Sequence, residues 1–222
     1  MVKKISTGTE QLLAYEENGE IILTLNNPRY KNPLSEELTP YLRKILKKIS
    51  KDSKYKLLTI QGAGNSFCSG GNIKKMDSNS NIKIKYSMKD KIKDLEKKQL
   101  ELTYLISSLK IPTIALITGA VAGAGFPLAL SCDIRIGNSN AFFISNYSNI
   151  GLSGDYGISW YLTSILGAAR AKEIMFLNER IYAKKSYEIG LLNFLFQKNF
   201  KNAVHKIKNN ILSQPPATIK LI

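Results

Sequence analysis

The chain opens with two short apolar runs separated by polar residues. Glutamine, leucine, alanine and tyrosine occupy residues 11–15, and isoleucine and leucine occupy residues 21–25 apart from Thr24. Between them, Asn18 and Gly19 form a turn sequence, because both residue types adopt the positive φ angles of tight hairpin turns. The pattern predicts a β-hairpin.

Helical periodicity follows the hairpin. Apolar residues recur at helical spacing over residues 38–49, and Ser35 stands where a capping serine belongs. Strands are predicted at residues 56–60, 113–117, 133–136, 141–144 and 192–196, and helices at 95–105, 126–130, 157–166, 168–176, 184–189 and from about 199. Strands that alternate with helices are typical of an α/β protein with a largely parallel sheet.

Composition narrows the class further. The 222 residues are 44% hydrophobic and 22% charged, as in an ordinary folded domain. No apolar run approaches the ~18 to 20 residues that a membrane-spanning helix needs, and no apolar stretch follows the first two lysines. Cys68 and Cys132 are typical of free thiols in a reduced compartment. We therefore expect a cytoplasmic protein that does not associate with membranes. One histidine and two widely spaced cysteines also predict no metal site.

The net charge of +15 is unusual. Such a positive charge favours the binding of polyanions. However, only five of the 32 basic residues are arginines, the residue type that most often contacts phosphates and bases. Two interpretations stay open: a solvated lysine-rich surface, or a surface that binds a polyanion, with the lysine-rich residues 83–93 as its candidate.

Two glycine-rich runs each follow an apolar strand, at residues 67–72 and 119–125. Amide N–H groups at the start of a helix are unpaired and partly positive. Neither run has the spacing of a P-loop or a dinucleotide-binding fingerprint. The glycines either allow tight turns or, if the two loops converge, bring together a pair of N–H donors for one oxygen that gains negative charge.

Residues 57–73 and 111–134 resemble the two signatures of the crotonase family, the enoyl-CoA hydratases and isomerases. The resemblance continues through residues 151–160, 166–171 and 189–192. It implies a spiral of ββα units that assembles into homotrimers or pairs of trimers. It also implies a substrate carried as a coenzyme A thioester, with no resident cofactor.

The resemblance assigns roles to individual residues. It implies that the amides of Ser69 and Ala124 hold the thioester oxygen. The residues that it places at the coenzyme A thioester are Lys31, Ser69, Gly70, Gly71 and Asn72. The other interpretation of Lys31 is a plain surface lysine.

The departures from the family pattern concern the acid–base groups. Where the hydratases carry two glutamates, this chain has Pro127 and Tyr147. Asp133 and Asp155 are the only acids between residues 102 and 172. Asp133 is interpreted as structural. Asp155 matches the aspartate base of the isomerase-type members, although it could also cap the helix that follows. We expect an isomerase that moves a C=C bond.

Three alternatives remain. Asp155 could be the nucleophile of a hydrolase or dehalogenase, a hydratase could use a rearranged acid–base pair, or residues 83–93 could bind RNA in a noncatalytic relative. His205 is interpreted as a half-buried helix residue. The resemblance also implies C-terminal helices beyond residue 222, so we expect a single domain over residues 1–222 that lacks its trimerisation helices.

Overall fold

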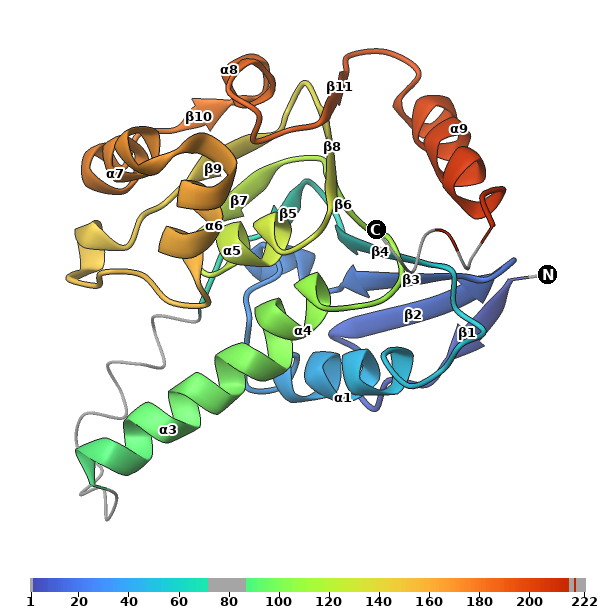
Figure 1. Ribbon diagram of the computed structural model, residues 1–222, viewed down its shortest axis with the longest axis horizontal. Coiled ribbons are helices and arrows are strands. Elements are labelled where there is room, and N and C mark those ends of the chain that lie inside the picture. Colours follow the sequence, from blue (N-terminus) through green and yellow to red (C-terminus); the bar gives the residue numbers. More distant parts are fainter. Residues whose placement is uncertain (1, 72–86, 216–217, 219–222) are drawn as a thin grey trace.

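Two β-sheets form the framework of the protein (Figure 1). A computed structural model describes residues 2–71, 87–215 and 218. Within them, the larger sheet has the strand order β1 (Lys3–Ile5), β2 (Leu12–Glu17), β3 (Glu20–Leu25), β4 (Leu57–Gly62), β6 (Thr113–Ile117), β8 (Ile134–Asn138) and β11 (Phe194–Phe196). The smaller sheet has the order β10 (Ile181–Tyr182), β9 (Phe142–Ile144), β7 (Ala120–Ala122) and β5 (Ser66–Cys68).

The predicted hairpin is confirmed. Strands β2 and β3 pair antiparallel, with Leu12 opposite Leu25. Asn18 and Gly19 have φ angles of 50° and 84° in the turn between the strands. The turn residues therefore act as the sequence indicates.

From β3 to β11, neighbouring strands of the larger sheet run parallel. Strands β4, β6 and β8 lie in the larger sheet, and each is followed along the chain by a strand of the smaller sheet: β5, β7 and β9. A helix comes next in each repeat. This arrangement confirms the predicted α/β spiral of ββα units.

Helices cover both sheets. They are α1 (Thr39–Ile49), α3 (Met88–Gln99), α4 (Leu105–Ser107), α5 (Gly125–Leu130), α6 (Ile158–Leu166), α7 (Ala168–Leu177), α8 (Ala183–Glu188) and α9 (Phe200–Leu212), with short turns η1 (Pro28–Tyr30), η3 (Leu100–Tyr104) and η4 (Ser148–Ile150). Helices α3 and α4 are joined through η3 into one long rod (Figure 1). The prediction that Ser35 caps this helix is wrong. Helix α1 begins at Thr39 with Leu38 at its N-cap position and no side-chain cap, and Ser35 Oγ instead accepts from the Leu38 amide in the turn formed by residues 36–38.

Strands β5 and β7 correct the expectation that the two glycine-rich runs are loops throughout. Both strands are three residues long and made of small or mixed residues, so no apolar run marks them. They exist because they pair with each other in the smaller sheet. Each glycine segment thus starts from a fixed strand.

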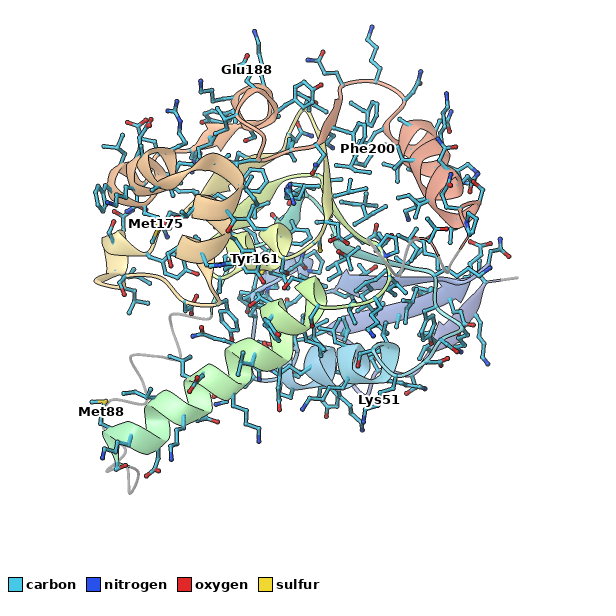
Figure 2. All side chains as sticks on the ribbon, in the orientation of Figure 1. Lys51, Met88, Tyr161, Met175, Glu188 and Phe200 are labelled. Atoms are coloured by element: carbon cyan, nitrogen blue, oxygen red, sulfur yellow. The ribbon has the colours of Figure 1, made fainter. Side chains whose placement is uncertain are left out.

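Most buried side chains form one core between the sheets and helices α1, α5 and α6 (Figure 2). A second, smaller core lies under α9 and is built from Leu57, Ile114, Leu116, Ile136 and Val204. At its edge, Lys208 Nζ lies 2.6 Å from Glu20 Oε1, and Thr59 Oγ1 donates to the same oxygen at 2.5 Å.

Two sequence expectations concern surfaces and membranes. In the part of the chain that the structure describes, no helix is long and apolar enough to span a bilayer. Residues 83–86 of the candidate polyanion-binding segment lie outside the described residues. The segment continues as the exposed beginning of α3.

Candidate active site

The two glycine segments lie against each other. Gly70 has φ +94°, and a methyl group on it would stand 2.9 Å from the Ala122 carbonyl oxygen and 3.1 Å from the Ala124 nitrogen. A methyl group on Gly125 would stand 2.6 Å from the Cys68 carbonyl oxygen. Side chains at Gly70 and Gly125 would therefore force the segments apart. The backbones of residues 68–71 and 122–125 meet as one junction, which we call the glycine junction.

Ser69 does not supply the amide donor that was expected of it. Its N–H donates to the Lys31 carbonyl oxygen at 2.9 Å, and its Oγ donates to the Tyr30 carbonyl oxygen at 3.2 Å. A backbone N–H has one proton to give, and that of Ser69 is already in use. The expectation for Ser69 is wrong. Its role in this structure is to fasten the first glycine segment to η1.

Two other amides at the glycine junction are available. Among the described residues, neither Gly71 nor Ala124 donates its N–H to an acceptor. A methyl group on Gly71 would meet no described residue within 4 Å. Gly71 is held by a parallel bridge to Leu34, and Ala124 stands at the start of α5.

Lys31 and Asn72 are the remaining residues expected at the thioester. Lys31 is exposed at the end of η1, and its carbonyl group contacts the Ser69 amide, so it lies beside the first glycine segment. Asn72 lies outside the described residues.

Sequence reasoning missed Asn32. This side chain is fully buried; it accepts from the Asn27 amide at 2.8 Å and donates to the Ala63 and Ser66 carbonyl oxygens at 2.9 and 2.8 Å. It therefore ties η1 to the approach of β5. An asparagine beside a proline looks like a loop residue, and only its distant partners show its role.

Asp155 lies in the tight turn that leads into α6. Gly154, Tyr156 and Gly157 around it all have positive φ. The Tyr147 hydroxyl donates to Asp155 Oδ1 at 2.5 Å. Gly157, not Asp155, occupies the cap position of α6, and no side chain caps it, so the capping alternative is wrong. The carboxyl group is half-buried, and burial raises its pKa, while the hydrogen bond from Tyr147 acts in the opposite direction.

Asp133 is structural, as expected. Its Oδ2 accepts from the Thr113 amide at 2.8 Å and from Thr113 Oγ1 at 2.7 Å, which joins the starts of β6 and β8. His205 is exposed on α9, whereas it was expected to be half-buried, and α9 lies far from α6 (Figure 1). Neither residue can assist Asp155.

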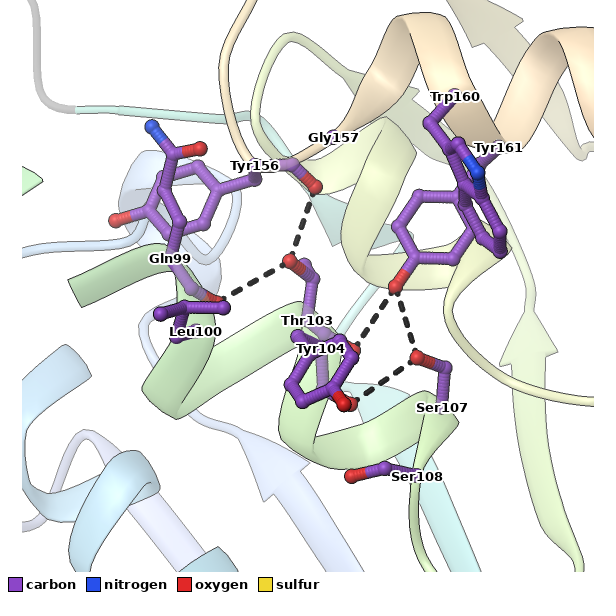
Figure 3. Close-up of a pocket in the computed structure, with 10 residues that line it drawn as sticks. All are labelled: Gln99, Leu100, Thr103, Tyr104, Ser107, Ser108, Tyr156, Gly157, Trp160 and Tyr161. Atoms are coloured by element: carbon purple, nitrogen blue, oxygen red, sulfur yellow. Dashed lines mark hydrogen bonds between the residues drawn. The ribbon is translucent and has the colours of Figure 1, made fainter. Parts of the chain in front are cut away.

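A cavity of about 580 Å³ opens beside the Asp155 turn, between the long helix and α6 (Figure 3). Tyr156, Trp160 and Tyr161 form one wall, and η3 and α4 form the other. Thr103 Oγ1 donates to the Tyr156 carbonyl oxygen at 2.9 Å, so the helix also holds the turn that carries Asp155. The lining is mostly apolar and aromatic, as in pockets for small organic groups.

A comparison with known protein families identifies the chain. The family described as enoyl-CoA hydratase/isomerase matches residues 16–222. The chain belongs to this family. The enoyl-CoA hydratase/isomerase match spans both glycine segments and the Asp155 turn, and it confirms the resemblance to the crotonases.

Some similar members of the enoyl-CoA hydratase/isomerase family are named as isomerases and others as hydratases. The 1,2-epoxyphenylacetyl-CoA isomerase of Escherichia coli is 28% identical over 96% of this chain and 80% of its own length. The short-chain-enoyl-CoA hydratase of Clostridium acetobutylicum is 30% identical over 93% of this chain and 77% of its own. A crystal structure of an enoyl-CoA hydratase from Mycobacterium avium superposes with a TM-score of 0.84 at 26% identity, over 96% of this chain and 82% of that one.

As a member of the enoyl-CoA hydratase/isomerase family, this chain is an acyl-CoA enzyme with the crotonase fold. Two of its residues, Pro127 and Tyr147, depart from the pattern that the resemblance implies. Pro127 is buried within α5 and has no ionisable group, and Tyr147 is buried against Asp155. At the two positions where the resemblance places the glutamates of the hydratases, this chain therefore has one proline and one hydrogen-bond donor to an aspartate.

Proposed function

We propose that this enzyme shifts a carbon–carbon double bond in an acyl-coenzyme A thioester, with Asp155 as the group that carries the proton. One observation carries the proposal. Asp155 is a half-buried carboxyl group whose chain neighbours Tyr156 and Gly157 line an apolar cavity, while Pro127 and Tyr147 replace the carboxylates that the resemblance assigns to hydration. A single carboxylate suffices to take a proton from one carbon and return it to another.

The amides of Gly71 and Ala124 polarise the thioester carbonyl in this proposal. When Asp155 removes a proton from the acyl chain, negative charge collects on the thioester oxygen, and fixed N–H dipoles stabilise it without rearranging. Gly71 takes the place expected for Ser69, because the Ser69 amide is bonded to Lys31. Backbone donors need no particular side chain.

Burial suits Asp155 to this role. A carboxylate that is partly removed from water is a stronger base than an exposed one, because burial disfavours its charged form. Its pKa is therefore closer to neutral pH than that of an ordinary aspartate. The cavity lined by Tyr156 and Trp160 accommodates the apolar part of the acyl group.

Coenzyme A enters as part of the substrate and not as a resident cofactor. Lys31 is exposed beside the first glycine segment, where its ammonium group can meet a phosphate of the nucleotide. We also propose that the enzyme assembles into homotrimers or pairs of trimers and works in the cytoplasm. Sedimentation equilibrium of the purified protein tests the assembly.

The variant Asp155→Asn tests the function. We expect its isomerase turnover on a panel of enoyl-CoA thioesters to fall by about 10² to 10⁴-fold, because proton transfer by a positioned side chain contributes that much. Glu188→Gln, which removes an exposed carboxyl group on α8 (Figure 2), is the control and keeps full activity. Circular dichroism spectra of both variants check that they are folded.

Three results contradict the proposal. Asp155→Asn could keep its isomerase turnover. Water addition to crotonyl-CoA by the wild type could exceed double-bond migration, which indicates a hydratase. Release of free coenzyme A together with the acid indicates a hydrolase that uses Asp155 as its nucleophile.

A further inference from the structure

Tyr147 and Asp155 form a closed pair at the edge of the candidate site. The tyrosine side chain is 4% exposed, and its hydroxyl donates to Asp155 Oδ1 at 2.5 Å. Burial raises the pKa of the tyrosine, as does the charge of Asp155, so the hydroxyl keeps its proton and remains the donor. Among the described residues, this is the only side-chain hydrogen bond that Asp155 accepts.

The segment between the two residues explains why the contact matters. Residues 148–154 comprise η4 and a turn with two glycines at positive φ, and residues 149–153 are exposed. Such a segment does not by itself fix the side chain that follows it. The hydrogen bond closes the segment and directs the carboxyl group.

We propose that Tyr147 is the positioning residue of the acid–base group, and that it decides which carboxylate oxygen carries the proton. The hydrogen bond from Tyr147 lowers the basicity of Oδ1, so Oδ2 is the oxygen that reacts. This inference rests on the proposed function, because it assigns a task to a residue that acts through Asp155.

The proton balance follows directly. Asp155 Oδ2 takes a proton from a carbon of the acyl chain, and the electron pair of that C–H bond passes into the enolate, whose charge lies on the thioester oxygen. The enolate then takes the proton back from Oδ2 at another carbon, and the double bond reforms in its new place. Tyr147 keeps its own proton throughout, and its hydrogen bond leaves Oδ1 the less basic of the two oxygens.

Few other ionisable groups among residues 2–71 and 87–215 face the pair. Tyr156 follows Asp155 in the chain, and Arg43 of α1 donates to the Tyr156 hydroxyl at 3.3 Å. Cys68 lies near Tyr156, and burial keeps this thiol protonated because it raises the pKa to about 12. The Tyr147 hydroxyl is therefore the main group that stabilises the charged form of Asp155 against its burial.

The test compares pH–rate profiles of the isomerase reaction. In Tyr147→Phe the carboxylate loses its donor, so the acidic limb of the kcat profile moves up by about one to two pH units. We expect kcat to fall by roughly tenfold to a hundredfold and KM to stay unchanged, because a misdirected base slows chemistry without loosening the thioester. Tyr187→Phe, an exposed tyrosine on α8, is the control.

A second variant covers the case in which Tyr147→Phe misfolds. Replacing Tyr147 by 3-fluorotyrosine keeps the shape and the hydroxyl but makes the donor more acidic, so the acidic limb moves to lower pH. Opposite shifts in the two variants support the proposal, and coincident profiles with wild-type kcat overturn it. If Asp155→Asn retains turnover, the proposed function fails instead, which separates the two outcomes.

Discussion

At the scale of single residues, Asp133 and Asp155 carry the same carboxyl group in two different surroundings. Asp133 accepts two hydrogen bonds from Thr113 and joins two strands. Asp155 receives one side-chain hydrogen bond, from Tyr147, and is half-buried beside a cavity. The first carboxylate is satisfied by its neighbours, while the second has one oxygen that accepts no side-chain hydrogen bond among the described residues.

The burial of Asp155 predicts a pH-dependent difference in stability. Its pKa is raised in the folded state, so the folded protein holds this proton more tightly than the unfolded chain, and stability falls as pH rises from about 4 through the raised value. Asp155→Asn lacks this loss. We therefore expect its melting temperature to match the wild type near pH 4 and to exceed it near pH 7.

Thermal melts from pH 4 to pH 8 measure this difference. Glu188→Gln is the control, because it removes an exposed carboxyl group and should follow the wild-type curve. A variant Asp155→Asn that is less stable than wild type at pH 7 would show that the carboxylate is fully compensated in the fold.

Adjacent glycines at the glycine junction should respond differently to substitution. Gly70→Ala places a methyl group 2.9 Å from a carbonyl oxygen at a φ of +94°, so we expect it to cost more than about 1 kcal/mol in the free energy of unfolding. Gly71→Ala meets open space and should change it by less than about 0.5 kcal/mol. Urea denaturation compares the two, and equal costs would contradict the described contact between the segments.

Sequence reasoning reached some of these residues and not others. Asp155 could be found because acids are scarce around it and because its turn resembles that of the isomerases. The error at Ser69 arose because its partner, Lys31, lies 38 positions earlier in the chain, and no local pattern reports a hydrogen bond of that range. The contacts of Asn32 were missed for the same reason, since its partners Ala63 and Ser66 lie 31 and 34 positions later in the chain.

At the scale of elements, α9 shows how a terminal helix is attached to a sheet. Its apolar face covers the smaller core, and Lys208 reaches Glu20, whose carboxylate also accepts from Thr59. The side chains of Lys208 and Glu20 are only 12% and 9% exposed. A partly formed contact here would leave a charge buried without its partner.

Lys208→Met should therefore be costly. It leaves the Glu20 carboxylate buried without its cation, and we expect a loss of about 3 to 5 kcal/mol in the free energy of unfolding. Lys206→Met, on the exposed side of the same helix, should change it by less than about 0.5 kcal/mol. The double variant Glu20→Gln, Lys208→Met should recover part of the loss. Similar urea midpoints for the two single variants would contradict a stabilising role for this pair.

Most elements could be predicted, since the hairpin and the longer helices have strong apolar periodicity and clear turn residues. Strands β5, β7 and β10 could not, because each has only two or three residues, too few to establish an alternating pattern. Pairing across the smaller sheet, and not local propensity, makes them strands.

At the scale of the whole molecule, both cysteines report on the core. Cys68 is 0% and Cys132 is 2% exposed, and burial raises the pKa of both thiols, that of Cys68 to about 12. We expect the native protein to react only slowly with an aromatic disulfide reagent, and the unfolded protein to release two equivalents of product at once. Rapid labelling of either thiol in the native state would show that the core opens locally.

The sequence predicts the α/β class and the single spiral, but not how the two sheets share the strands. Residues 70 and 124 meet only because each ββα unit crosses from the larger sheet to the smaller one at the same end. The fold could be identified only from several motifs in order along the chain, since either glycine run alone is also compatible with an ordinary turn.

The glycine junction is built from peptide groups, and this has an evolutionary consequence. Random substitution alters side chains but leaves main-chain dipoles where the fold puts them. Under the proposed function, a duplicated gene can therefore exchange the residues at positions 127, 147 and 155 and acquire a different reaction, while the peptide groups proposed to bind the thioester are inherited unchanged.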